Sequence, residues 1–124
     1  MSDLPELKMW LAIRTDLGMS PGKIAVQAAH AASHLQMKAQ YKSYALLMDY
    51  LRGPTTKVAV RVDSELALRR VASEAEAAGV LWYVVRDAGR SEVAPGSLTV
   101  CAFGPAYRAY LPAYLKRLQL FEGS

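Results

Sequence analysis

The sequence predicts an α/β fold built on a largely parallel sheet. Three apolar runs have the length of buried strands, at residues 8–14, 57–62 and 81–85. Between them lie two longer stretches in which apolar residues have helical spacing, and each stretch follows a capping residue. Two successive strand–helix–strand units make three strands parallel, with right-handed crossovers. A fourth strand at residues 98–103 follows without a helix, so it is expected to pair antiparallel with the third.

The first strand leads through a tight turn into the first helix. Ser20 suits the N-cap, and Pro21 suits the first helical position, where a missing N–H has no cost. Backbone N–H groups at such a helix start commonly hold an anion. Lys23 is unexpected in this turn, because a cation there is disfavoured by roughly 0.3–1 kcal/mol. The position indicates that Lys23 serves a site, and that its removal alone would slightly stabilise the helix.

The first helix presents two stripes of residues at spacings of three and four. One stripe is apolar and faces the core: Ile24, Ala28, Ala31 and Leu35. The other is polar: Lys23, Gln27, His30, His34 and Lys38. We favour a solvated face for His34 and Lys38, whereas for the three residues beside the helix start a solvated face and a binding site stay equally open. The helix is expected to reach residue 51, with a break near Gln40, and to end at Gly53-Pro54.

The remaining elements follow from the same signals. Asp63 or Ser64 caps the second helix, and Gly79 ends it. The apolar side of this helix is predicted to comprise Leu66, Leu68, Val71, Ala72 and Ala75. A loop spans residues 86–97, Gly104-Pro105 breaks the fourth strand, and a last helix is expected over residues 107–119, with Pro112 as a candidate interruption.

Length and composition restrict the class of protein. The 124 residues suit one domain, residues 1–124, and 52% of them are hydrophobic, which is enough for a substantial core. The net charge of +4 is compatible with a nucleic-acid partner. The single cysteine, Cys101, excludes an internal disulfide. No apolar stretch is long enough to span a membrane, and the acidic N-terminal residues lack a signal-peptide core, so a cytoplasmic protein is expected.

Ligands of open α/β sheets bind outside the carboxyl ends of the parallel strands. The predicted topology collects polar residues at this edge: Asp16, Lys23, Asp87, Arg90, Ser91 and Thr99. Asp87 and Arg90 alone are better explained by a stabilised turn. With Lys23 at the same edge, a site becomes the better explanation.

Several common signatures are absent. There is neither a Gly-x-Ser-x-Gly elbow nor a phosphate-binding P-loop. His30 and His34 have the i,i+4 spacing of zinc ligands, but no His-Glu-x-x-His motif accompanies them. No metal or other cofactor is therefore expected.

Three stretches of the chain match a known family. Residues 15–31, Thr-Asp-Leu-Gly-Met-Ser-Pro-Gly-Lys-Ile-Ala-Val-Gln-Ala-Ala-His-Ala, resemble the first signature of the archaeal and eukaryotic-type peptidyl-tRNA hydrolases. Residues 57–65 resemble the second strand and helix start of the family, and residues 86–97, with Thr99 and residues 103–105, resemble its last signature. The stretches follow the family's order over nearly the whole chain.

The resemblance implies a three-layer α/β/α sandwich on a four-stranded mixed sheet, with strand order 2-1-4-3 and strand four antiparallel. It implies hydrolysis of the ester between a peptide and the 3′ end of tRNA, which recycles tRNA from aborted translation. It also implies a homodimer.

The family's functional residues carry over to matching positions of this chain. Lys23 matches a helix-start lysine, Asp87 a loop aspartate and Thr99 a strand-four threonine, while Ser91 stands where the family often has threonine. The catalytic candidates are therefore Lys23, Asp87, Ser91 and Thr99. The substrate-binding candidates are Asp16, Arg90, and Gln27 and His30 of a Gln-x-x-His motif. Further basic groups expected near tRNA phosphates are Arg14, Arg86, His34 and Lys38.

Ester hydrolysis needs an activated water and a stabilised oxyanion. Asp87 can orient or deprotonate water, or it can only hold Lys23 in place. Lys23 can hold the oxyanion or a phosphate, and Ser91 and Thr99 can position water or ribose. A nucleophilic Ser91 has no evident histidine base. The alternatives are a non-catalytic module that binds tRNA or a protein on the same fold, and a hydrolase of another acyl ester or amide.

Overall fold

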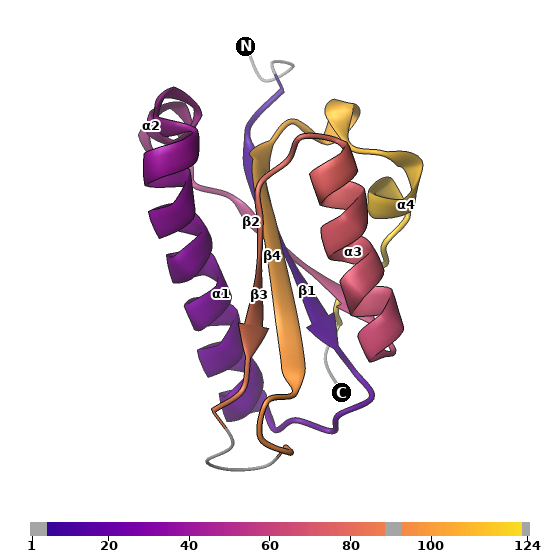
Figure 1. Cartoon of the computed structure of the whole chain (residues 1–124). Coiled ribbons are helices and arrows are strands. Elements are labelled where there is room, and N and C mark those ends of the chain that lie inside the picture. The colour runs from indigo at the N-terminus through magenta and orange to yellow at the C-terminus, as the bar shows by residue number, and fades with distance from the viewer. Residues whose placement is uncertain (1–4, 89–92, 123–124) are drawn as a thin grey trace.

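The computed structural model describes residues 5–88 and 93–122 (Figure 1). In chain order the elements are β1 (Lys8–Arg14), α1 (Pro21–Lys42), α2 (Tyr44–Arg52), β2 (Lys57–Val62), α3 (Glu65–Ala77), β3 (Trp82–Arg86), β4 (Leu98–Ala106), a 3₁₀ turn (Arg108–Tyr110) and α4 (Ala113–Lys116). Four strands form one sheet, ordered β2-β1-β4-β3. β1 pairs with β2 in parallel, and β4 pairs antiparallel with β1 and β3. The sheet order and the antiparallel fourth strand are confirmed, and β4 separates β3 from the parallel pair.

Helices cover both faces of the sheet, with α1 and α2 on one side and α3 and α4 on the other (Figure 1). The alternation along β1 divides the core between the two layers. Met9, Leu11 and Ile13 belong to the cluster beneath α1, whereas Trp10 and Ala12 belong to the cluster beneath α3. Because β1 is buried on both faces, it appears in the sequence as a continuous apolar run.

The first helical stretch is interrupted by Ser43, and not near Gln40 as the sequence suggested. Ser43 has φ −152° and ψ 57°, which ends α1 and begins α2. Its N–H still donates to the Ala39 carbonyl, so the backbone bonds continue through the break. Serine competes with helical hydrogen bonding more than glutamine does, which favours the break at this residue. Gly53 caps the end of α2 as predicted.

α3 begins after Ser64, whose hydroxyl accepts a hydrogen bond from the Ala67 N–H at 3.0 Å. The predicted apolar side is confirmed for Leu68, Val71, Ala72 and Ala75, which are all buried. Leu66 is a wrong prediction, because it is 79% exposed. It lies two residues before Leu68, and side chains two apart on a helix point in different directions.

β4 continues through Gly104-Pro105 to Ala106, so the predicted break is wrong. The Gly104 N–H donates to the Leu81 carbonyl at 2.9 Å, and a Cβ on Gly104 would lie 2.7 Å from the Lys8 carbonyl oxygen. The register between β1 and β4 shifts between Lys8 and Trp10, beside this point. A proline is tolerated in a strand at such an irregularity.

The predicted last helix is replaced by the 3₁₀ turn and the four-residue α4. Pro112 precedes α4 as its N-cap residue, and because proline lacks an N–H it starts a helix more readily than it continues one. Residues beyond α4 then cover the outer edge of β2. The Arg61 N–H donates to the Gln119 carbonyl, and the Phe121 N–H donates to the Ala59 carbonyl, both at 2.9 Å.

Candidate functional site

An ion pair joins the start of α1 to the end of β3. Lys23 lies in the first turn of α1, which Ser20 caps by accepting from the Lys23 N–H at 3.2 Å. Its Nζ lies 2.5 Å from Oδ1 of Asp87, the residue after β3. The Asp87 side chain is 2% exposed and that of Lys23 is 13% exposed. A buried carboxylate next to the helix start therefore explains the cation in the first turn.

The backbone of Asp87 is also fixed. Its N–H donates to the Ser97 carbonyl at 2.8 Å, and its own carbonyl accepts from the Gly96 N–H at 3.0 Å. These bonds close the base of the loop between β3 and β4. The carboxylate is thus held from the sheet side as well as by Lys23.

A second polar pair lies behind Lys23, one turn further along α1. The Thr99 hydroxyl on β4 donates to Oε1 of Gln27 at 2.6 Å, and both side chains are buried. A solvated face and a binding site were equally open for Gln27, and its burial excludes the solvated face. Because Thr99 is fully buried, it contacts the candidate site through Gln27.

A groove of about 570 Å³ runs between α1 and β3 and begins at the ion pair. Its lining includes Lys23, Gln27, His30, Tyr83 and Asp87. Tyr83 and Val85 pack against the core on the α1 side of the sheet, and Asp87 continues their period of two beyond the strand end. The period of two in residues 83, 85 and 87 is visible in the sequence and is a signal that could have predicted the groove.

The far half of the polar stripe also contacts β3. The His34 ring stacks on the Tyr83 ring, with centroids 4.8 Å apart and planes at 15°. Lys38 Nζ donates to the Trp82 carbonyl at 2.8 Å and lies 4.6 Å from the centre of the Trp82 ring. The predicted solvated face therefore holds for His34, which is exposed, whereas Lys38 is half-buried and bonds to Trp82.

Asp16 lies apart from the ion pair, outside the groove lining. Its two carboxylate oxygens accept from Nε and one terminal nitrogen of Arg14, at 3.0 and 2.6 Å. These hydrogen bonds lower the pKa of Asp16 from its ordinary value and raise that of Arg14. Arg14 is itself buried and also donates to the Leu98 carbonyl. The pair therefore fixes the end of β1, and Arg14 is poorly placed for the expected phosphate contact.

Two of the predicted site residues, Arg90 and Ser91, lie outside the residues that the structure describes. Within residues 5–88 and 93–122, no group of three His, Cys, Asp or Glu side chains is placed to hold a metal ion. The rings of His30 and His34 are 6.5 Å apart and tilted by 41°.

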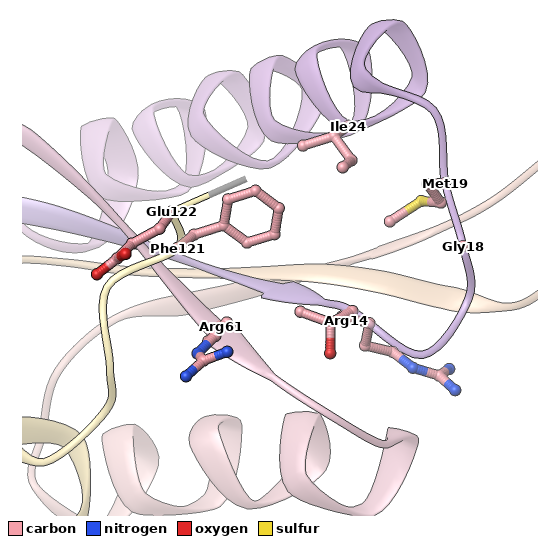
Figure 2. Close-up of a pocket in the computed structure, with 8 residues that line it drawn as sticks. Arg14, Gly18, Met19, Ile24, Arg61, Phe121 and Glu122 are labelled. Carbon is pink, nitrogen blue, oxygen red and sulfur yellow. The ribbon is translucent and has the colours of Figure 1, made fainter. Parts of the chain in front are cut away.

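A second pocket, of about 530 Å³, lies along α1 near the edge of β2. Figure 2 shows Met19, Ile24 and Phe121 directed toward the same space between α1 and the sheet. Both arginines that line it are bonded within the chain, because Arg14 contacts Asp16 and Arg61 contacts the Gln119 side chain. The groove with the Lys23–Asp87 pair is therefore the better candidate for chemistry.

Comparison with known proteins identifies the family. Residues 7–121 match the family model described as peptidyl-tRNA hydrolase PTH2. The chain is 35% identical over 98% of its length to peptidyl-tRNA hydrolase 2 of Saccharomyces cerevisiae, and 34% identical over 96% to a probable peptidyl-tRNA hydrolase 2 of Dictyostelium discoideum. It is 37% identical over 80% to peptidyl-tRNA hydrolase of Methanocaldococcus jannaschii.

The chain spans 62% of the yeast relative and 57% of the Dictyostelium relative, but the aligned part covers 86% of the archaeal one. The family match extends from before β1 to the residues that pair with the edge of β2, so it includes all four strands and the groove. The chain belongs to the archaeal and eukaryotic-type peptidyl-tRNA hydrolase family.

Proposed function

We propose that this chain hydrolyses the ester bond between a peptide and the 3′-terminal ribose of tRNA. A water oxygen attacks the ester carbonyl, and the bond between that carbon and the ribose oxygen breaks. One proton of the water passes to the ribose oxygen and the other is released to solvent, so the products are a free peptide carboxylate and an intact tRNA 3′ hydroxyl. The family and the names of the relatives support this reaction, and the groove supplies groups suited to it.

The observation that carries the proposal is the Lys23–Asp87 pair at the head of the groove. An ammonium held in a fixed position, and shielded from water on most sides, stabilises developing negative charge better than a mobile one. We assign Lys23 to the oxyanion of the tetrahedral intermediate. Asp87 holds Lys23 in place and also orients the attacking water. The two roles that the sequence left as alternatives for Asp87 are therefore combined.

The other site residues receive supporting roles. Gln27 and His30 line the same groove and contact the substrate, and Thr99 positions Gln27 from behind. Ser91 remains a candidate for positioning water or ribose on the basis of the sequence. Asp16 acts through Arg14 on the end of β1 and does not contact the substrate.

The test is cleavage of a defined N-blocked aminoacyl-tRNA, followed as release of the labelled acyl group. Wild-type chain is expected to release it, and Lys23→Ala and Asp87→Asn are expected to be strongly impaired. Lys42→Ala and Asp49→Asn are matched controls, because both residues are exposed on α1 and α2, away from the groove. tRNA binding without cleavage would favour the non-catalytic module. Equal cleavage of acyl esters lacking tRNA would favour a hydrolase of another substrate.

The assembly and location of the chain complete the proposal. We propose that residues 1–124 act as one domain and as a homodimer in the cytoplasm, where translation supplies the substrate. Among the described residues, none of the helices combines the length and the hydropathy of a membrane span. Relatives from cow, mouse and human carry the word mitochondrial in their names. Light scattering, a single unfolding transition and cell fractionation test the three statements separately.

A further inference from the structure

We propose that the groove between α1 and β3 continues beyond the ion pair as a stacking site for bases of the single-stranded 3′ end of tRNA. The platform of this site is the His34–Tyr83 ring pair. The inference rests on the proposed function, because it assigns the groove to the RNA part of the same substrate. It concerns two residues that neither the sequence motifs nor the ester chemistry requires.

The ring pair is built as a platform. The His34 and Tyr83 rings are nearly parallel, at 15°, with centroids 4.8 Å apart. Tyr83 is half-buried and packs against the core beneath α1, which fixes the lower ring. His34 is exposed and covers it from the helix side. A flat ring on a fixed support is the arrangement on which proteins stack unpaired bases.

The platform lies at a distance from the ion pair that suits a short strand. His34 follows Lys23 by 11 positions on one continuous helix, which corresponds to about 16 Å along the axis. Stacked bases rise about 3.4 Å per nucleotide, so this distance spans a few nucleotides. Both residues line the same groove, together with His30 between them. A 3′ terminus with its ester at Lys23 therefore brings preceding bases to His34.

The charge of the groove favours RNA over the peptide. Its described lining includes the cations Lys23 and Arg86, and Asp87 is the one carboxylate among the described lining residues. That carboxylate is already paired with Lys23. Beyond His34, the Lys38 ammonium lies at the Trp82 ring. A phosphate backbone meets cations at both ends of this path, whereas a peptide of arbitrary sequence has no need of them.

The experiment separates base stacking from catalysis. The first probe is a fluorescent single-stranded RNA of about six nucleotides with the tRNA 3′-terminal sequence, which at ~3.4 Å per nucleotide is long enough to reach His34. The other two probes are an N-blocked aminoacyl-tRNA and an ester of the same acyl group with adenosine alone. His34→Ala is expected to weaken binding of the RNA roughly tenfold, as for loss of one stacked base. It is expected to raise KM for the tRNA ester, with a much smaller effect on the adenosine ester. Tyr83→Leu, which keeps apolar packing, is expected to act in the same direction.

His34→Phe keeps a ring and removes the imidazole, so it is expected to retain RNA binding. Tyr41→Ala is the matched control, because Tyr41 is an 88% exposed aromatic on the same helix outside the groove lining. The proposal is overturned if the wild-type chain does not bind the RNA or if His34→Ala binds it normally. It is also overturned if His34→Ala impairs cleavage of the tRNA ester and the adenosine ester equally. Ester cleavage with no dependence on His34 would leave the proposed function standing and this inference refuted. RNA binding that depends on His34, without any ester cleavage, would support this inference and refute the proposed function.

Discussion

The Thr99 hydroxyl donates a 2.6 Å hydrogen bond to Oε1 of Gln27, and this bond links the centre of the sheet to α1 directly behind the Lys23–Asp87 pair. Both side chains are buried, so neither can exchange the other for bulk water. Removing one partner leaves a buried polar group with a lost bond, which costs more than the bond itself contributes. The pair is therefore a positioning device with a measurable energetic signature.

Thr99→Val is expected to lower the free energy of unfolding by about 1–3 kcal/mol, because the Gln27 oxygen loses its donor. Turnover should fall with it, while Thr99→Ser, which keeps the hydroxyl, should retain both. Denaturant unfolding and single-turnover cleavage measure the two effects. A Gln27→Leu, Thr99→Val double variant should be less destabilised than the sum of the single variants. Strict additivity would show that the two side chains are not coupled.

Lys23→Ala and Asp87→Asn are expected to lower turnover by roughly 100-fold or more, as for loss of a charged group that stabilises the transition state. The position of Lys23 at the helix start would by itself predict a small gain in stability from Lys23→Ala. Because Lys23 faces the buried Asp87 carboxylate, the substitution is expected to lower the free energy of unfolding. Loss of the facing cation should instead cost about 3 kcal/mol. A Lys23→Met, Asp87→Leu variant should recover much of this stability and stay inactive. Thermal unfolding and ester cleavage check the two effects, and near-normal turnover by either single variant would remove that residue from the mechanism.

Stability should depend on Asp16 in acid. The pKa of Asp16 is lowered from 3.8 by its hydrogen bonds with Arg14, so the charged form is favoured in the folded chain. Its contribution is therefore present above about pH 4 and is lost as the pH falls below that value. Asp16→Asn should have a lower Tm than the wild type at pH 7, and the difference should shrink at pH 3. Asp49→Asn, an exposed carboxylate, serves as the control, and a constant difference across this range would contradict the expectation.

Arg90 remains a prediction from the sequence, because it lies outside the described residues. If it contacts a tRNA phosphate, Arg90→Ala weakens binding and flattens the dependence of log affinity on log salt by roughly 0.7. Binding titrations of tRNA at several salt concentrations measure that slope, with the exposed Arg52 on α2 as the matched position for a control substitution. A loss of activity with an unchanged slope would assign Arg90 to its own loop.

Local signals in the sequence predicted much of the frame around the site. β1 and β2 begin and end where their apolar runs do, and Ser20 and Ser64 cap the helices as expected. These features depend on residues close together in the chain. The place of β4 between β1 and β3 depends on contacts over long separations, and it followed only from the family resemblance.

Only part of the site could be predicted, because some of its contacts join residues far apart in the chain. A lysine in the first turn of a helix indicated a nearby anionic partner. The sheet order was needed to predict that Asp87 lies within reach of Lys23. Gln27 and Thr99 are 72 positions apart, and no local pattern marks them as a pair. Pro105 was misjudged because its tolerance depends on the register shift across β1. Leu66 was assigned to the apolar side because it is hydrophobic, although its position around the helix axis points it away from that side.

The covered edge of β2 has a consequence for synthesis of the chain. Residues 119–121 supply the hydrogen bonds along that edge, and they are made more than fifty positions after β2 itself. Until residues 119–121 have left the ribosome, the edge of β2 in a nascent chain is unpaired and accessible to other chains made on the same mRNA. The exposed cations Lys57 and Arg61 on β2 oppose pairing between two such chains, because they bring like charges together. The same two side chains therefore protect the growing polypeptide during the interval before its own tail can do so.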